Sequence, residues 1–145
     1  MQQSAAAYEA IGYRSNANTL RWMSAYAARG LGEVAEARRL VAEGILASAV
    51  TWDLTYLIEV LPAAALCLLD EGAIERAVEV YELARTLPVI GNSAWVQDVA
   101  GKPIAEAAKG LPFDVVAAAR ERGRARDMLA TCRELAEEFG GPAPP

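Results

Sequence analysis

The chain has 145 residues, a formal net charge of −5 and 54% hydrophobic residues. This length suits one domain with a buried core, and the negative charge argues against non-specific nucleic-acid binding, which depends on basic side chains. Alanine is the commonest residue, Leu, Glu and Arg are plentiful, and no long Val/Ile/Thr alternation occurs. Such a composition favours helices over strands, so the predicted fold class is all-α.

The first two predicted helices lie before the first glycine-rich turn. One is expected over 2–14, where small and aromatic residues recur on one side. Ser15 or Asn16 is a suitable N-cap for the next, which is expected to run to about Arg29. Gly30-Leu-Gly32 then breaks the helix, because glycine enters turn conformations without a Cβ penalty.

Three longer helices are predicted in the middle of the chain. The first covers about 33–48 and pairs with the helix before it. Thr51 is a suitable cap for a long helix that ends near Asp70. Pro62 lies inside that helix and removes an amide donor, so a kink or break is expected there. Residues 73–85 form the most regular helical pattern of the chain.

Shorter helices are predicted in the last third. Asn92 or Ser93 caps the first of them, and Pro103 suits the first turn of another after an interruption at Gly101. The remaining signals are a helix start at Gly110-Leu-Pro112, a helix end at Gly123, a cap at Asp127 and a disordered tail over 140–145. About eight helices in four hairpins are expected, within a single domain over 1–139.

One motif occurs twice, forty residues apart (77 minus 37). Each copy has a turn glycine followed, at intervals of five, four and three residues, by a small, a large and a small residue. Small residues seven apart lie on one stripe of a helix, where another helix can approach. The members are Gly72, Ala77, Tyr81 and Ala84 in one copy, Gly32, Ala37, Val41 and Gly44 in the other, and Ala65 and Ala25 seven residues before the turns.

The run from Ala65 to Ala84 resembles a tetratricopeptide repeat, although the forty-residue period is longer than the usual ~34 residues. That family has a small residue in the first helix, a turn glycine, and then alanine, aromatic and alanine at these spacings. The resemblance implies a right-handed solenoid of antiparallel helix hairpins. Its packing signature would consist of Ala37, Ala65, Gly72, Ala77, Tyr81 and Ala84.

Three segments also resemble the C-terminal helical arm of bacterial STAND-class signalling ATPases. They are Asn18-Thr-Leu-Arg-Trp22, Arg76-Ala-Val-Glu-Val-Tyr81 and Arg120-Glu-Arg-Gly-Arg-Ala-Arg-Asp127. Members of that class are multidomain regulators with an upstream nucleotide-binding module and often a DNA-binding or other effector domain. The resemblance implies that this arm senses an input and restrains or releases the ATPase.

Residues that support common enzyme chemistry are absent or isolated. The chain has no histidine, which is the commonest general base and transition-metal ligand. Cys67 and Cys132 are far apart in apolar surroundings, which favours core packing over a disulfide or a redox pair. No phosphate-binding loop is present. We therefore expect a non-catalytic protein with no catalytic residues, metal or cofactor.

No membrane or export segment is predicted. The longest apolar run, 60–69, is shorter than the ~20 residues that a membrane helix needs. The N-terminus lacks a basic region followed by an apolar block, which a secretory signal would have. The expected location is the cytoplasm.

Trp22, Tyr26 and Arg29 are the candidate partner-binding residues. They are spaced i, i+4 and i+7 on the first helix of a predicted hairpin. In the solenoids that the chain resembles, this helix lines the concave groove, and aromatic and arginine side chains are common binding hot spots. The alternative is that the two aromatic rings belong to the core.

A second cluster, Arg120, Arg122, Arg124 and Arg126, surrounds Gly123. One interpretation is that these cations complement the dipole at a helix C-terminus. The other is an anion or phosphate contact.

The favoured function is a protein–protein interaction or sensor module of a larger signalling or transcriptional regulator. Its partner would be a protein or peptide, without direct nucleic-acid or membrane binding. The alternatives are a self-association module and a small-ligand sensor. The helix over 2–14 has more apolar residues than one docking face needs, so a monomer or a weak homodimer through Tyr8 and Ile11 is expected.

Overall fold

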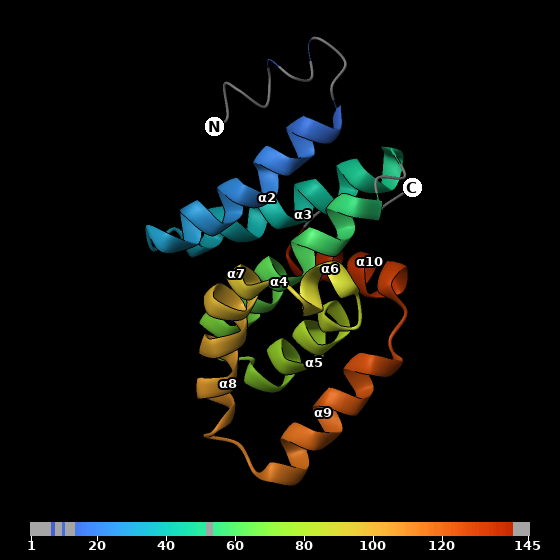
Figure 1. Cartoon of the computed structure of the whole chain (residues 1–145). Helices are drawn as coiled ribbons and strands as arrows, with labels where there is room; N and C mark the ends of the chain where they lie inside the picture. The colour runs from blue at the N-terminus through green and yellow to red at the C-terminus, as the bar shows by residue number, and fades with distance from the viewer. Residues whose placement is uncertain (1–6, 8–9, 11–13, 52–53, 141–145) are drawn as a thin grey trace. The chain divides into compact units, whose positions relative to one another are not determined.

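The computed structural model describes residues 7, 10, 14–51 and 54–140, and the regular elements within these residues are all helical (Figure 1). The all-α prediction is confirmed. Among the described residues, no helix is both long and apolar enough to cross a membrane. The helices are α2 (Arg14–Gly30), α3 (Val34–Thr51), α4 (Leu54–Asp70), α5 (Ile74–Arg85), α6 (Pro88–Gly91), α7 (Ala94–Val96), the π turn η1 (Gln97–Gly101), α8 (Lys102–Ala108), α9 (Phe113–Ala125) and α10 (Met128–Glu138).

The chain forms two compact units. The first, here called the N-terminal unit, comprises Met1–Val60 and Cys132–Pro145, and the second, the central unit, comprises Leu61–Thr131. Helices α4 and α10 contribute residues to both units. The expectation of a single repeat domain over 1–139 stays a prediction. Most of the predicted helix over 2–14, including Tyr8 and Ile11, and of the predicted tail lies outside the described residues.

The same turn closes α2 and α4. Gly32 and Gly72 have φ angles of 80° and 78°, in the left-handed region that favours glycine. In each turn the glycine amide donates to the carbonyl three residues before it, and the next amide donates to the carbonyl five residues before it, at 2.9–3.0 Å. These bonds define the Schellman motif, which satisfies the last carbonyls of a helix. The hydrogen bonds of the turn therefore repeat at the same forty-residue interval as the sequence motif.

In the N-terminal unit, α2 packs along α3. Ala25 of α2 and Ala37 and Val41 of α3 are buried. Tyr56, near the start of α4, is also buried, and its ring lies so close to Gly44 of α3 that a Cβ at this position would overlap it. The first copy therefore has glycine where the second copy has Ala84, because the Tyr56 ring occupies the space that a Cβ would need.

The C-terminal end of α10 is fixed to α3 within the same unit. Nη2 of Arg38 donates to the Glu138 carbonyl at 2.9 Å. The guanidinium of Arg38 also lies 4.8 Å from the centroid of the Phe139 ring, a cation–π distance. One arginine therefore completes a helix end and covers an aromatic ring.

In the central unit, α5 contacts α6, α8 and α9 (Figure 1). Its buried residues include Ala77, Val80 and Ala84, each with no exposed surface. The segment of α4 within this unit is fully apolar around Leu66 and is buried. Burial of α5 on several sides places this helix at the centre of the unit.

Three expectations about helix boundaries are wrong. Helix α3 continues to Thr51, which is therefore not a cap. The break expected at Pro62 does not occur: helix α4 continues through this residue, because Pro62 and its neighbours are buried and this packing outweighs one lost hydrogen bond. The alternative expectation, a kink at Pro62, stays a prediction. Gly123 does not end α9, which continues to Ala125.

The predicted interruption at Gly101-Lys-Pro103 is also wrong. Helix α7, the π turn and α8 follow one another directly, and the Lys102 amide donates to the Gln97 carbonyl five residues before it. Pro103 has no amide to donate, and a wider turn immediately before it accommodates this loss within a continuous helix.

Two predicted N-caps are confirmed. Oγ of Ser93 accepts a hydrogen bond from the Val96 amide at 3.2 Å. Oδ1 of Asp127 accepts one from the Ala130 amide at 2.7 Å. Each side chain satisfies an amide in the first turn that has no partner within the helix.

Candidate functional site

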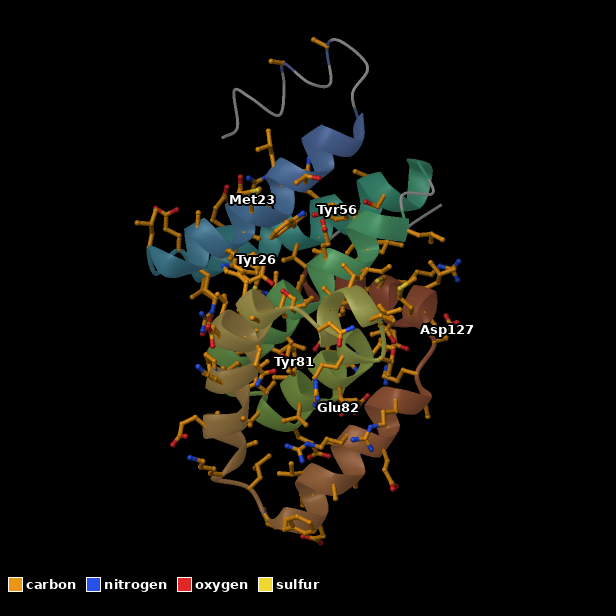
Figure 2. All side chains as sticks on the ribbon, in the orientation of Figure 1. Met23, Tyr26, Tyr56, Tyr81, Glu82 and Asp127 are labelled. Atoms are coloured by element: carbon orange, nitrogen blue, oxygen red, sulfur yellow. The ribbon has the colours of Figure 1, made fainter. Side chains whose placement is uncertain are left out.

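The three candidate partner-binding residues lie on α2 in the N-terminal unit. Trp22, Tyr26 and Arg29 are all half-buried. The rings of Trp22 and Tyr26 meet edge to face, with centroids 5.7 Å apart and planes at 84°, a preferred geometry for aromatic pairs. Met23 on the same helix is 44% exposed (Figure 2). The helix therefore presents a fixed aromatic pair with an exposed thioether beside it.

Ala37 of the repeat packing signature lies in the N-terminal unit, at the position equivalent to Ala77, and the other five signature residues lie in the central unit. Ala37 of α3, Ala65 of α4, and Ala77 and Ala84 of α5 have no exposed surface. Tyr81 of α5 is 7% exposed, and Gly72 lies in the exposed turn before α5. The signature residues therefore belong to the buried core, except Gly72, which forms the turn.

A buried carboxylate, Glu79, organises the contact between α5 and α9 in the central unit. The Glu79 side chain is only 7% exposed and pairs with three arginines. Arg76 lies 3.0 Å away on the same helix, Nε of Arg122 donates at 3.0 Å from α9, and Nη1 of Arg126 donates at 2.5 Å from the residue after α9. Nε of Arg126 also donates to Oγ1 of Thr131 at 2.9 Å.

Two further glutamates extend this cluster along α5. Glu75, one turn before Glu79, accepts from Nη2 of Arg122 at 2.5 Å. Glu82 has a side chain that is 8% exposed and accepts from Nη2 of Arg124 at 2.9 Å and from Nη1 of Arg85 at 3.2 Å. Arg122, Arg124 and Arg126 are therefore bound to carboxylates of α5. These ion pairs come in addition to any interaction of the arginines with the dipole of their own helix.

The close approach of the two helices depends on Gly123. A Cβ at this position would overlap the carbonyl oxygen of Glu79 and lie 3.0 Å from the Glu82 Cβ. Gly123 is buried and lies between Arg122 and Arg124 in the sequence. Glycine here lets the backbones meet while the arginines on both sides reach the glutamates.

The arginines keep Glu79 ionised. Burial alone raises the pKa of the Glu79 carboxyl, but hydrogen bonds from Arg122 and Arg126 and the nearby charge of Arg76 outweigh it, and the net pKa lies below its usual value. The cluster is therefore made of charged pairs at neutral pH.

A small cavity lies beside Tyr81 in the central unit. It has a volume of about 140 Å³ and is bounded by α5, the π turn, α8 and α9. The Tyr81 hydroxyl donates to Oε1 of Gln97 at 3.2 Å. A Cβ at Gly101 would lie 2.5 Å from this hydroxyl, so the glycine makes room for it. Burial raises the pKa of Tyr81, which therefore stays protonated at neutral pH.

A shallower groove of about 460 Å³ lies at the start of α5. It is lined by Gly72, Ala73, Ile74, Glu75, Arg76, Glu79, Leu111 and Arg122. Most of its charged groups already belong to the arginine–glutamate cluster.

The described residues contain no group of three or more Cys, Asp or Glu side chains placed to hold a metal ion. Cys67 and Cys132 are both buried, as expected for residues of the core. Sequence reasoning missed Gln97 and Glu79 as candidates, and it assigned Tyr81 to repeat packing without its hydrogen bond to Gln97. The signal for Glu79 was the spacing of Glu75, Glu79 and Glu82, which lie four and three residues apart on one face of a helix. The signal for Gln97 was Pro103, whose missing amide favours a wide turn just before it.

The chain was compared with protein families, curated proteins and solved structures. No family model, curated protein or solved structure matches the chain. The tetratricopeptide-like and STAND-class resemblances therefore depend on the residues of this sequence alone.

Proposed function

We propose that this chain is a non-catalytic helical-repeat module that binds a protein or peptide partner. The observation that supports this most is the repetition, at forty residues, of one hydrogen-bonded turn together with buried small residues after it. Repeated hairpins of this kind stack into rigid solenoids whose inner helices present a binding surface. The solenoid geometry and its right-handed sense belong to this proposal.

The partner surface in this proposal is α2 of the N-terminal unit. Trp22 and Tyr26 fix each other by an edge-to-face contact and are half-buried, so they lose little conformational freedom on binding. Arg29, one turn further along, supplies a positive charge. Rigid aromatic residues beside an arginine are the composition typical of hot spots.

In the wider proposal, the module is the sensor arm of a multidomain regulator of the STAND class. Binding of the partner would then release or restrain an upstream ATPase. This part of the proposal follows from the three segments that resemble such arms.

The test is selection of peptides from a displayed random library on the purified chain, followed by affinity measurement with variants. For the selected peptides, Trp22→Ala should weaken binding by about tenfold or more, as expected for a hot spot. Trp95→Ala is the matched control, because Trp95 is 48% exposed on α7 in the other unit, and it should leave the affinity within about threefold.

Two outcomes would contradict the proposal. One is that selected peptides bind the Trp22 and Trp95 variants equally well. The other is concentration-dependent dimerisation in sedimentation that Trp22→Ala abolishes, which would indicate a self-association module instead.

A further inference from the structure

One arginine of the cluster around Gly123 differs from the other three. Arg122, Arg124 and Arg126 pair with glutamates of α5. Arg120 is exposed and makes no ion pair or hydrogen bond within the part of the chain that the structure describes. It lines the cavity beside Tyr81. A guanidinium facing a cavity without a carboxylate partner is available for an anionic ligand.

A second donor faces the same cavity. The side-chain oxygen of Gln97 accepts from the Tyr81 hydroxyl at 3.2 Å, which fixes the orientation of the amide. The amide nitrogen of Gln97 donates to no protein group among the described residues. It is therefore a neutral donor that can complete the coordination of an anion held by Arg120.

The negative charge in the cavity wall is already balanced. Glu82 lines the cavity, but its carboxylate accepts from Arg124 at 2.9 Å and from Arg85 at 3.2 Å. Arg120 adds to the cavity wall a positive charge that this carboxylate does not pair with. The local field therefore favours an anion even though the whole chain is acidic.

The size and the remaining lining restrict the ligand. The volume of about 140 Å³ is close to that of cavities that hold about six non-hydrogen atoms, such as benzene. The apolar wall consists of Val78, Ile104, Ala105 and Ala108. A carboxylate with a short aliphatic chain matches both the guanidinium and this wall, whereas inorganic phosphate matches only the guanidinium.

We propose that this cavity, the carboxylate pocket, binds a short-chain carboxylate. Arg120 and the Gln97 amide hold the carboxylate group, and the aliphatic chain lies against Val78 and Ile104. The ligand is either a free acid or the carboxylate of a peptide. The site lies in the central unit and is independent of the peptide surface proposed on α2.

The test is a titration of the ¹⁵N-labelled full chain with butyrate, followed by NMR of the Gly101 amide and the Gln97 side-chain amide. Butyrate should shift both signals in a saturable manner. Butyramide, which has the same shape without the charge, should not, and inorganic phosphate should bind at least tenfold more weakly than butyrate. A capped peptide with one glutamate distinguishes the sources: tighter binding of butyrate indicates a free acid, and tighter binding of the peptide indicates a partner's carboxylate.

Substitutions then locate the site. Arg120→Gln should weaken butyrate binding at least tenfold, and it should fold normally because Arg120 is exposed. Arg133→Gln, on an exposed position of α10, is the matched control and should leave the affinity unchanged. Ala105→Leu, at an exposed position of the cavity wall, should also abolish binding by filling the space. No saturable shift, an equal response to butyramide, or equal affinities of the Arg120 and Arg133 variants would overturn the proposal.

Discussion

The helices that follow the two equivalent turns have an ion pair at the same two repeat positions, with the charges exchanged. In α3 the pair is Glu36 and Arg39, 2.6 Å apart, and forty residues later in α5 it is Arg76 and Glu79, 3.0 Å apart. Arg39 is 47% exposed, and within the described part of the chain its ion pairs are with glutamates three and four residues away on its own helix. Glu79 is 7% exposed and binds two further arginines more than forty residues away in the sequence.

The difference lies in what covers the pair. Helix α9 packs along α5, and its close approach at Gly123 removes Glu79 from solvent. An exposed pair typically contributes about 0–1 kcal/mol, because water screens it. A buried carboxylate that loses all of its partners costs about 3–5 kcal/mol, because an uncompensated charge then remains out of water. The same repeat position is therefore expected to be energetically neutral in one helix and essential in the other.

The largest expected effect comes from removing the covered carboxylate. Glu79→Ala should lower the free energy of unfolding by about 2–4 kcal/mol, because Arg76 and Arg126, whose side chains are 23% exposed, lose a shared partner and Arg122 loses one of its two glutamates. Arg39→Ala, at the equivalent position of α3, should change it by less than about 1 kcal/mol. Urea denaturation followed by circular dichroism measures both. Similar losses for the two variants would show that burial by α9 does not distinguish these positions.

A smaller effect is expected when α9 is moved away from α5 without a change of charge. The added methyl group in Gly123→Ala would overlap the Glu79 carbonyl, a backbone atom that cannot rotate aside, and should destabilise the protein by about 1–3 kcal/mol. Gly30→Ala is the matched control, because Gly30 ends α2 and has nothing within 4 Å of an added Cβ. The control should be neutral or stabilising by up to about 1 kcal/mol in the same denaturation experiment. A Gly123→Ala variant as stable as the control would mean that the helices are not in close contact.

Local signals in the sequence predicted much of the fold. The all-α class, the turns at Gly32 and Gly72 and the caps at Ser93 and Asp127 each depend on a few neighbouring residues. The break at Pro62 was wrongly expected because the cost of the proline is local, whereas the burial that offsets it depends on residues distant in the sequence. The π turn was missed because Pro103 was read as a helix interruption, whereas the helix accommodates the proline by a wider turn just before it.

The arginine–glutamate cluster could not be derived from local patterns. Arg122 and Arg124 are two residues apart on a helix and do not share a face, so their sequence spacing gives no reason to assign both to α5. Their partners lie 42 to 47 residues earlier. The pairing becomes evident only once α9 is known to return along α5. The carboxylate pocket has the same origin, because its lining comes from four separate helical segments.

The smallest effect expected from the comparison is a change in acid sensitivity. The arginines hold the pKa of Glu79 below 4.5, the usual value that it regains in the unfolded chain. The native state therefore binds fewer protons than the unfolded state, and the stabilisation is present above about pH 4.5 and is lost as the pH falls through the lowered native pKa. The wild-type free energy of unfolding should decrease between about pH 5 and pH 3, and Glu79→Gln, which has no carboxyl to titrate, should decrease less steeply.

The equivalent pair in α3 supplies the control for this experiment. Hydrogen bonding by Arg39 also lowers the pKa of Glu36, so the sign of its contribution is the same. Glu36 lies in an exposed pair, however, and solvent screening reduces what its titration contributes to stability. Glu36→Gln should therefore retain nearly all of the wild-type pH dependence in urea denaturation curves recorded across this range. If Glu36→Gln reduced the pH dependence of the free energy of unfolding as much as Glu79→Gln does, burial by α9 would have no electrostatic effect. The two repeat positions would then contribute equally to stability.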